Sequence, residues 1–489
     1  GTFLASVDES LVISTYSTIS SQFQRLSEGS WLLVAYNLGY CVSLPVYGVV
    51  SDRFDKKRVL IGSYLLFTLG SIACGASTSL VQLALARVIA GIGGAGMVIL
   101  VSIVLTCIDI VKPEDVAIYR GYENTVYITG RSLGAPIGGL LIDTIGWRWS
   151  FIGQVPIAIA CIMLVGYLLP ELRPKTFCRD NESPFLSRVC SFDFLGIISF
   201  TVSVILLLVV LHTTGMQKSD RPDWAYIALI GLILAITLFI LTEVYWAKNP
   251  LLPTDLTRKS LGGYCSVQFL LFAGRNALVS SLIPYFIRTA NTSDLIASLS
   301  FVLTSLGVSA GGLVSGYLIK RTRQYKIMEL IALCLSTLIY VAIFIQWQDG
   351  CSIWESLYLF ASGLTLGIVF SSQFVGMSAS SPKSRLASCI GAYYLSQQLG
   401  FIVGPAAGLA LVQGLFASRL GRSLVVPDRD LTIKHILDDA RYTRMLPAAA
   451  QRVVRESYLY GFKFAPVLSV VCNLAALLVV LHLRAEKIL

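Results

Sequence analysis

The chain has 489 residues, of which 55% are hydrophobic and only 13% are charged, and its formal net charge is +10. Soluble globular proteins carry about 25% charged residues, so this composition excludes a soluble protein and indicates one that crosses a membrane several times. The basic residues lie between long apolar runs, which excludes nucleic-acid binding as the reason for the positive charge.

The apolar runs are contiguous and helix-length, which excludes the short alternating strands of a β-barrel. A helix needs about 20 apolar residues to span a bilayer. We therefore predict an all-α membrane protein whose first span starts almost at Gly1, so further residues are expected before it. The predicted spans are fourteen, at residues 1–20, 30–50, 59–78, 80–107, 116–141, 149–170, 194–213, 224–246, 263–287, 295–319, 327–346, 353–378, 386–416 and 458–483.

Lys and Arg residues predict the orientation, because they are concentrated in cytoplasmic loops. If the charged block at 52–58 is cytoplasmic, so are both termini and the loops at 109–120, 171–193, 247–262, 320–326 and 379–385. That side then carries 21 Lys and Arg residues. The polar segment 418–457 falls on the opposite side, where we expect a surface helix, with a gating role as the alternative.

The charged block follows the pattern Gly-x-x-x-Asp-Arg-x-x-basic-basic, formed by Gly48, Asp52, Arg53, Lys56 and Lys57. It can anchor two membrane helices, or it can be a conformational latch in which charges meet a neighbouring helix end. The pattern resembles the loop between helices 2 and 3 of the major facilitator superfamily. The glycine that is usual two residues after the arginine is replaced here by Asp55.

Two motifs recur at nearly the same offset, which predicts two related six-helix halves. Gly48-Val-Val-Ser-Asp52 recurs at 312–316, and the pattern of Gly130, Gly134, Pro136 and Gly138 recurs around Gly404 and Pro405. The spans at 194–213 and 224–246 have no counterpart. We therefore predict an N-terminal bundle at 1–170, a loop with two additional helices at 171–250, and a C-terminal bundle at 251–489.

The glycine-proline element in the fifth span lets helices approach closely and bends the chain, so it is either packing or a hinge. In the superfamily, such an element is characteristic of antiporters. The string Trp147-Arg-Trp-Ser-Phe-Ile-Gly-Gln154 and the motif Arg87-x-x-x-Gly91 resemble the fourteen-span drug:proton antiporter branch. The chain is most similar there to fungal vacuolar transporters of basic amino acids.

Ionisable residues inside the predicted spans include Asp8, Glu9, Arg87, Glu123, Arg131 and Arg275. A charge in hydrocarbon costs roughly 2.5–3.5 kcal/mol on insertion scales, so each is expected either to complete an ion pair or to handle solute and protons. Because burial disfavours the ionised carboxyl group, Asp8 and then Glu123 are the proton-binding candidates, with Arg87 favouring proton release.

Aligning the halves places Asp8 and Arg275 at equivalent positions of their first helices. We expect both to face a central cavity, where Arg275 would bind the carboxylate of a zwitterion and Asp8 or Glu123 its ammonium. Polar and aromatic residues should complete the lining, with packing between helices as the alternative for each. They are Tyr36, Asn37, Tyr40, Asn124, Tyr127, Gln154, Asn276, Tyr285, Gln373, Tyr393 and Gln397.

These observations favour a proton-coupled antiporter of the major facilitator fold, with two six-helix bundles and two extra central helices. The favoured substrates are basic amino acids, carried from the cytosol into the vacuole. The alternatives are efflux of cationic drugs, with the plasma membrane as the other location, and a non-transporting sensor. We expect a monomer whose partners are a cationic or zwitterionic small molecule and the lipid bilayer.

The sequence does not favour an enzyme, because it contains no recognisable nucleophile–base pair. The three histidines are scattered and the eleven cysteines lie mostly in apolar runs, so no metal-binding spacing is present. We expect no metal and no cofactor, with a proton gradient as the energy source.

Overall fold

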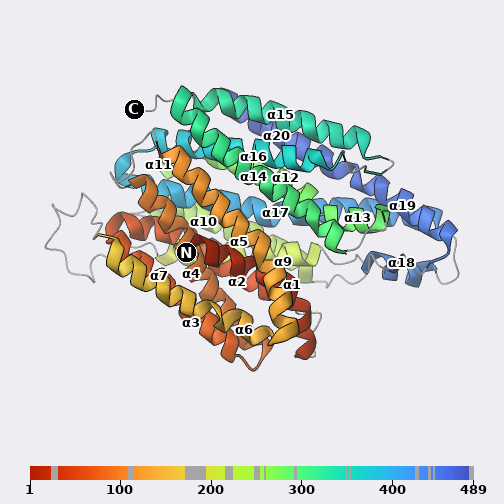
Figure 1. Ribbon diagram of the computed structural model, residues 1–489, viewed down its shortest axis with the longest axis horizontal. Coiled ribbons are helices and arrows are strands. Elements are labelled where there is room, and N and C mark those ends of the chain that lie inside the picture. The colour runs from red at the N-terminus through yellow and green to blue at the C-terminus, as the bar shows by residue number, and fades with distance from the viewer. Residues whose placement is uncertain are drawn as a thin grey trace.

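The computed structural model describes residues 1–23, 31–107, 115–170, 194–214, 224–246, 254–257, 260–290, 294–348, 350–351, 354–424, 429–438, 442–443 and 446–483. The regular elements within these ranges are helices, most of which run roughly side by side along the long axis of the molecule (Figure 1). The predicted loop at 171–193 lies outside the described residues.

The helices of the first part are α1 (Thr2–Gln22), α2 (Trp31–Arg53), α3 (Lys56–Ala76), α4 (Leu80–Cys107), α5 (Val116–Thr144), α6 (Trp147–Ile152) and α7 (Gln154–Leu168). Two further helices follow, α9 (Phe194–Thr214) and α10 (Trp224–Leu241), and α10 ends in the π-helical turn η3 (Thr242–Trp246).

The second part begins with the short α11 (Thr254–Thr257). It continues with α12 (Ser260–Val279), α13 (Leu282–Ala290), α14 (Asp294–Thr322), α15 (Tyr325–Gln346), α16 (Leu357–Ser380), η4 (Lys383–Arg385) and α17 (Leu386–Ser423). The last helices are α18 (Arg429–Asp438), α19 (Ala448–Phe462) and α20 (Phe464–His482).

Each of the fourteen predicted spans coincides with helix, and within the described residues 11 helical stretches are long and apolar enough to cross a membrane. The stretches α6–α7, α12–α13 and α19–α20 are each one apolar run with a break. Three of the fourteen predicted spans are not among these 11 stretches. α9 is found only as a shorter apolar helix, and α1 and α5 do not meet the criterion of length and hydropathy. α1 and α5 carry charged side chains and many Gly, Ser and Thr residues, which lower their hydropathy.

The helices pack in two groups. α1 lies along α5 and α4 along α2 and α3, whereas α12 packs on α17 and α20 and α14 on α16. The groups meet where α5 packs on α14 and where α17 packs on α2 (Figure 1). α9 and α10 pack on each other, and α9 also contacts α2.

In each group, a glycine of the repeated glycine-proline motif allows its helix to lie close against the first helix of that group. A Cβ atom at Gly134 would lie 2.4 Å from the Val7 carbonyl oxygen in α1, and one at Gly404 would lie 2.4 Å from the Ala273 carbonyl oxygen in α12. Pro136 and Pro405 lie inside α5 and α17. Small residues therefore bring both first helices close to their neighbours, and a hinge at these positions stays a prediction.

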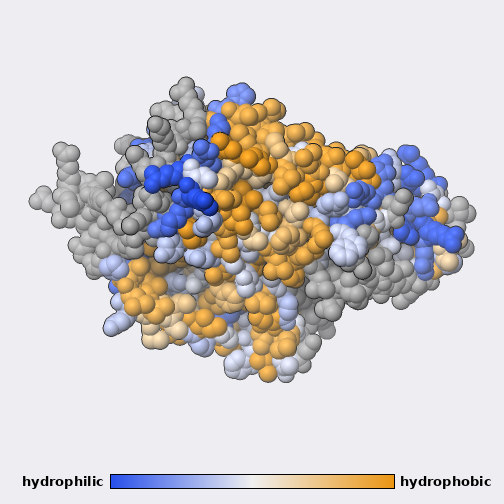
Figure 2. Space-filling view, turned by 45° about the horizontal axis from the view of Figure 1, so that its top comes forward, coloured by the Kyte–Doolittle hydropathy of each residue, from blue (hydrophilic) through white to orange (hydrophobic). Residues whose placement is uncertain are grey.

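The face shown in Figure 2 carries a broad apolar zone between two more polar ends. α10 contributes much exposed apolar surface, with Ile227 71% and Leu234 65% exposed. Side chains of this kind would be unfavourable in water but suit a lipid environment, so the apolar zone is the surface that faces the bilayer.

Candidate functional site

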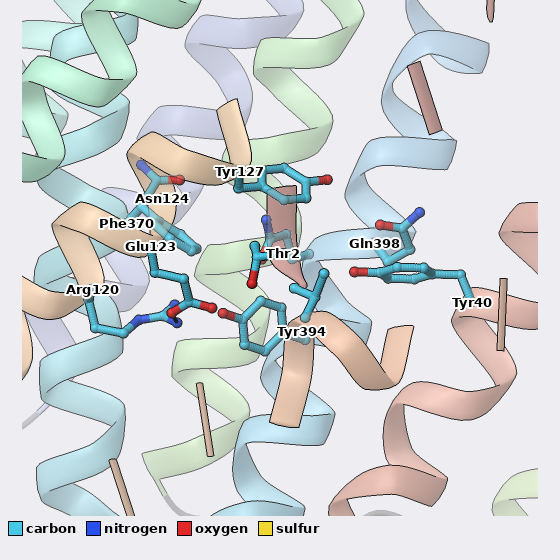
Figure 3. Close-up of a pocket in the computed structure, with 11 residues that line it drawn as sticks. Thr2, Tyr40, Arg120, Glu123, Asn124, Tyr127, Phe370, Tyr394 and Gln398 are labelled. Atoms are coloured by element: carbon cyan, nitrogen blue, oxygen red, sulfur yellow. Dashed lines mark hydrogen bonds and ion pairs between the residues drawn. The ribbon is translucent and has the colours of Figure 1, made fainter. Parts of the chain in front are cut away.

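Two adjoining cavities lie between the helix groups. The first, which we name the Glu123 cavity, has about 430 Å³ of empty space and is lined from α1, α2, α4, α5, α16 and α17 (Figure 3). The second, the Arg275 cavity, has about 530 Å³ and is lined from α5, α12, α14, α16 and α17. They share the side chains of Asn124, Tyr127, Phe370 and Gln397.

The Glu123 cavity contains a buried ion pair between Glu123 and Arg120 of α5. The guanidinium of Arg120 also donates to Ser102 Oγ at 2.6 Å, and Ser102 donates to Glu123 at 2.7 Å. The hydroxyl of Tyr394 lies 2.7 Å from Ser102 Oγ. Glu123 is therefore tied to three other polar groups in a single network.

The predicted loop at 109–120 overlaps the predicted span at 116–141, and the structure places Arg120 in the span. This residue lies in the second turn of α5, is 2% exposed and stacks on Phe374 of α16, with its central carbon 3.8 Å from the ring centre. The spacing of Arg120 and Glu123, three residues apart on one helix, is the signal that could have identified the pair.

The Arg275 cavity is bounded by two arginines whose partners differ. Arg131 of α5 lies 3.3 Å from a carboxylate oxygen of Glu9, and Tyr127 donates to the other oxygen of Glu9 at 3.1 Å. Arg275 of α12 is 8% exposed, yet among the described residues no carboxylate pairs with it, and its Nε has no hydrogen-bond partner. The charge of Arg275 is thus available to a ligand in the cavity.

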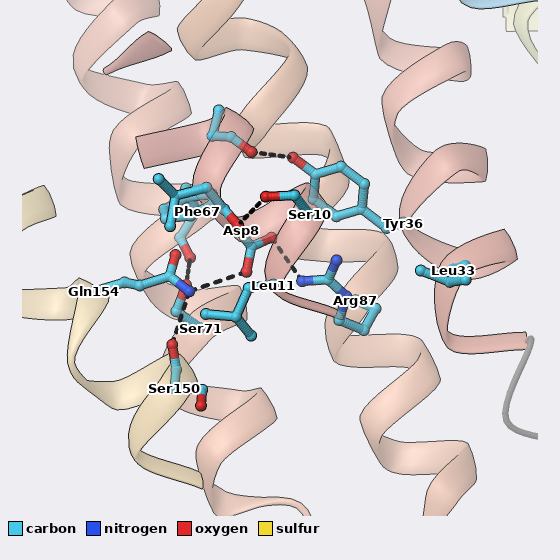
Figure 4. A network of polar contacts seen from close by, with 12 residues as sticks. Asp8, Ser10, Leu11, Leu33, Tyr36, Phe67, Ser71, Arg87, Ser150 and Gln154 are labelled. Carbon is cyan, nitrogen blue, oxygen red and sulfur yellow. Dashed lines mark hydrogen bonds and ion pairs between the residues drawn. The ribbon is translucent and has the colours of Figure 1, made fainter. Parts of the chain in front are cut away.

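Asp8 lies outside both cavity linings, which corrects the expectation that it faces Arg275. It is fully buried, accepts a hydrogen bond from Arg87 of α4 at 2.6 Å, and accepts another from Gln154 of α7 at 3.1 Å (Figure 4). The ring of Tyr36 covers the guanidinium at 4.4 Å. The pair joins α1 to α4 inside the first helix group, as the ion-pair alternative predicts.

The structure divides the predicted lining residues. Tyr40, Glu123, Asn124, Tyr127, Arg275, Asn276 and Gln397 line the cavities. Asn37 is one layer behind, where its Oδ1 accepts a hydrogen bond from the lining residue Gln398 at 2.7 Å. The other predicted residues, Tyr36, Gln154, Tyr285, Gln373 and Tyr393, do not belong to either lining.

The three excluded residues of the second helix group have other partners. Tyr285 stacks on Trp347 with ring centres 5.2 Å apart, and Tyr393 donates to Gln268 at 2.8 Å. Gln373 bonds to Glu329 of α15, a buried carboxyl group that the sequence reasoning missed. In the described part of the chain, no group of three or more His, Cys, Asp or Glu residues is placed to hold a metal ion.

The predicted latch joins the two helix groups at Asp52. One carboxylate oxygen of Asp52 accepts hydrogen bonds from the amide and the hydroxyl of Ser388 in the first turn of α17, at 3.1 and 2.6 Å. A negative charge is favourable at a helix N-terminus. Gly48 permits this contact, because a Cβ atom there would lie 2.9 Å from the Ala387 carbonyl oxygen.

The residues after Asp52 hold the start of α3. Asp55 is the N-cap of α3 and accepts from the Lys57 amide at 3.3 Å, which explains a carboxylate where a glycine is usual. Lys57 donates to the Gly166 carbonyl of α7 at 2.8 Å. A second tie between the groups, at the same end, is the 2.7 Å ion pair of Lys320 with Asp115.

We expect Asp52→Asn to loosen the latch. Losing the charge on the acceptor of two hydrogen bonds should cost about 1–2 kcal/mol, or roughly a tenfold rise in the open population. Cys389, which is fully buried beside Ser388, should then react about tenfold faster with a maleimide, as measured by mass spectrometry of its peptide. Asp55→Asn is the matched control and should leave this rate unchanged. Equal rates in both variants and the parent would contradict the latch.

Comparisons with known proteins agree with this architecture. Residues 1–405 match the family model described as Major Facilitator Superfamily. The "Vacuolar membrane amino acid uptake transporter fnx2" of Schizosaccharomyces pombe is 29% identical, over 95% of this chain and 80% of that protein. The "Multidrug resistance protein fnx1" of the same yeast is 28% identical, over 94% and 86%.

Two further similarities complete the comparison. The "Vacuolar basic amino acid transporter 1" of Saccharomyces cerevisiae is 26% identical, over 88% of this chain and 79% of that protein. Among solved structures, the human organic anion transporter MFSD10 (TETRAN) superimposes with a TM-score of 0.61 at 14% identity, over 98% of this chain and 97% of that chain. This last similarity shows a shared fold.

Proposed function

We propose a finer function for this chain, which belongs to the Major Facilitator Superfamily and is a secondary transporter rather than an enzyme. It is a proton-coupled antiporter that moves amino acids, with basic ones first, from the cytosol into the vacuole. The alternative is a cationic drug:proton efflux transporter. The proposal includes fourteen membrane crossings, six in each half and two between them, with both termini cytoplasmic.

The observation that carries the proposal is Arg275. A buried guanidinium without a carboxylate partner in the described protein is costly, unless a ligand supplies the negative charge. The planar fork of arginine donors suits a carboxylate better than any other group of an amino acid. A cationic drug has no group for this position, which supports amino acids over drugs.

The rest of an amino acid would extend from Arg275 toward the Glu123 cavity. Tyr127 lines both cavities, and Tyr40 and Tyr394 line the Glu123 cavity. Aromatic faces attract organic cations, and Glu123 adds a negative charge, although Arg120 already offsets it. These side chains can therefore accommodate an α-ammonium group or a basic side chain.

The relatives support the same proposal without deciding between substrates. These relatives are named as a vacuolar amino acid uptake transporter, a vacuolar basic amino acid transporter and a multidrug resistance protein. Those names also support a vacuolar membrane location for this chain.

The test is uptake into vesicles that contain the purified protein and carry an imposed pH gradient, acidic inside. We expect lysine, arginine or histidine to accumulate and the accumulation to collapse when a protonophore removes the gradient. A cationic dye and a neutral amino acid are the comparison solutes. Accumulation of the dye without any amino acid would favour the drug alternative, and binding without accumulation would favour a sensor.

A further inference from the structure

Glu329 lies near the start of α15, within a stretch long and apolar enough to cross a membrane, and is 1% exposed. Three carboxylates of α1 and α5 pair with arginines. Asp8 pairs with Arg87, Glu9 with Arg131, and Glu123 with Arg120. In the described structure Glu329 forms no ion pair, and its bonding partner is the neutral amide of Gln373 in α16.

The hydrogen bonds of this pair are incomplete if Glu329 is ionised. The amide nitrogen of Gln373 donates to Oε1 of Glu329. The amide oxygen of Gln373 is buried and has no hydrogen-bond partner among the described residues. An ionised carboxylate can only accept, so it leaves that oxygen unsatisfied, at a cost of about 1–3 kcal/mol.

A protonated carboxyl group has an O–H that can donate to the amide oxygen of Gln373. Acid and amide then satisfy each other with two hydrogen bonds, and no net charge is buried. We propose that Glu329 binds a proton in this structure and is a proton-binding site of the C-terminal half, separate from the central cavities.

The charged and titratable groups around Glu329 suggest how the proton leaves. Lys326 is one turn earlier on α15, and its ammonium donates to the Leu483 carbonyl after the end of α20. The tyrosines Tyr264 of α12, Tyr325 of α15 and Tyr393 of α17 are the titratable groups facing this region from the packed helices. If Lys326 turns from Leu483 to Glu329, it stabilises the carboxylate, and the proton passes to water at that end of the helices.

Contacts link this pair to the central cavity. Gln373 is followed in α16 by Phe374. The central carbon of the Arg120 guanidinium lies 3.8 Å from the centre of the Phe374 ring. Phe374 also meets Tyr393 edge-on, with ring centres 5.9 Å apart. Because α5 and α16 belong to different helix groups, movement of the groups would shift Arg120 relative to α16 and so disturb the Gln373–Glu329 pair. This coupling step rests on the proposed antiport function, whereas the protonation of Glu329 does not.

Infrared difference spectroscopy of the purified full chain tests the protonation directly. At neutral pH we expect a protonated-carboxyl C=O band that is present in the parent and lost in Glu329→Gln. The band should shift in Gln373→Leu, which removes the amide partner. Glu456→Gln, at an exposed position of α19, is the matched control and should keep the band. A band of equal intensity in the parent and Glu329→Gln would overturn the proposal.

Transport assays test the coupling step. The glutamine of Glu329→Gln is neutral and similar in shape, so solute binding and exchange without a gradient should stay within about twofold of the parent. Accumulation driven by a pH gradient should fall at least tenfold. Normal accumulation would overturn the coupling, even if the infrared band is lost. If the parent transports no amino acid, the proposed function fails, and the infrared result still decides the protonation of Glu329.

Discussion

Arg275→Ala is expected to reduce the apparent affinity for amino acids about a hundredfold. A guanidinium that binds a carboxylate in a site shielded from water makes two charge-assisted hydrogen bonds, and each is worth about 1.5–3 kcal/mol. Losing roughly 3 kcal/mol in total corresponds to a factor of about 100. The measurement is concentration-dependent uptake of the best amino acid found in the vesicle assay, for the parent and the variant.

Two matched variants make this result interpretable. Arg275→Lys keeps the charge but not the fork, so its affinity should fall between those of the parent and the alanine variant. Arg419→Ala removes an arginine that lies over Tyr460, away from both cavity linings, and should transport normally. A cationic dye should be carried by Arg275→Ala at least as well as by the parent. Unchanged amino acid affinity in Arg275→Ala would remove the main support for a zwitterionic substrate.

The second large effect is expected at the Asp8–Arg87 pair, and it concerns stability. Removing one partner of a buried ion pair leaves the other charge uncompensated, which costs about 3–5 kcal/mol. Both side chains are 1% exposed, so water cannot offset the loss. We expect Arg87→Ala to lower the yield and the midpoint of thermal unfolding sharply, as measured on the purified protein in detergent.

The double variant Asp8→Asn with Arg87→Gln separates a structural role from proton coupling. It buries no charge at this place, so most of the lost stability should return. If Asp8 carries the transported proton, this stable double variant should bind solute but not accumulate it against a pH gradient. If the pair is only structural, it should accumulate solute normally, and the proton role of Asp8 would be excluded.

The positions of the helices could be predicted from the sequence because hydrophobic length is a local property. All fourteen predicted segments are helical in the structure. The latch motif was also local enough to identify Asp52, although its partner Ser388 lies 336 positions away. The sequence also identified Arg275 as a charged residue inside a predicted span, where a charge is costly unless it has a partner or a function.

The faces of the helices could not be predicted in the same way. Asp8 and Glu9 are adjacent in α1, yet Asp8 bonds to α4 and α7 inside the first group, whereas Glu9 bonds to Arg131 and Tyr127 of the cavity wall. One residue along a helix is a rotation of about 100°, so neighbours in sequence face different helices. Arg120 lies where the predicted loop at 109–120 overlaps the predicted span at 116–141, and it was not counted among the charges inside the spans.

The sequence by itself thus determined that the chain crosses a membrane several times as helices, and which residues carry charge within them. Only the tertiary structure decided which charges neutralise one another. Asp8, Glu9 and Glu123 pair with arginines, whereas Arg275 meets no carboxylate and Glu329 meets a neutral amide in the described structure. Partner choice depends on how each helix is rotated against its neighbours, and that rotation is set by packing across the whole bundle.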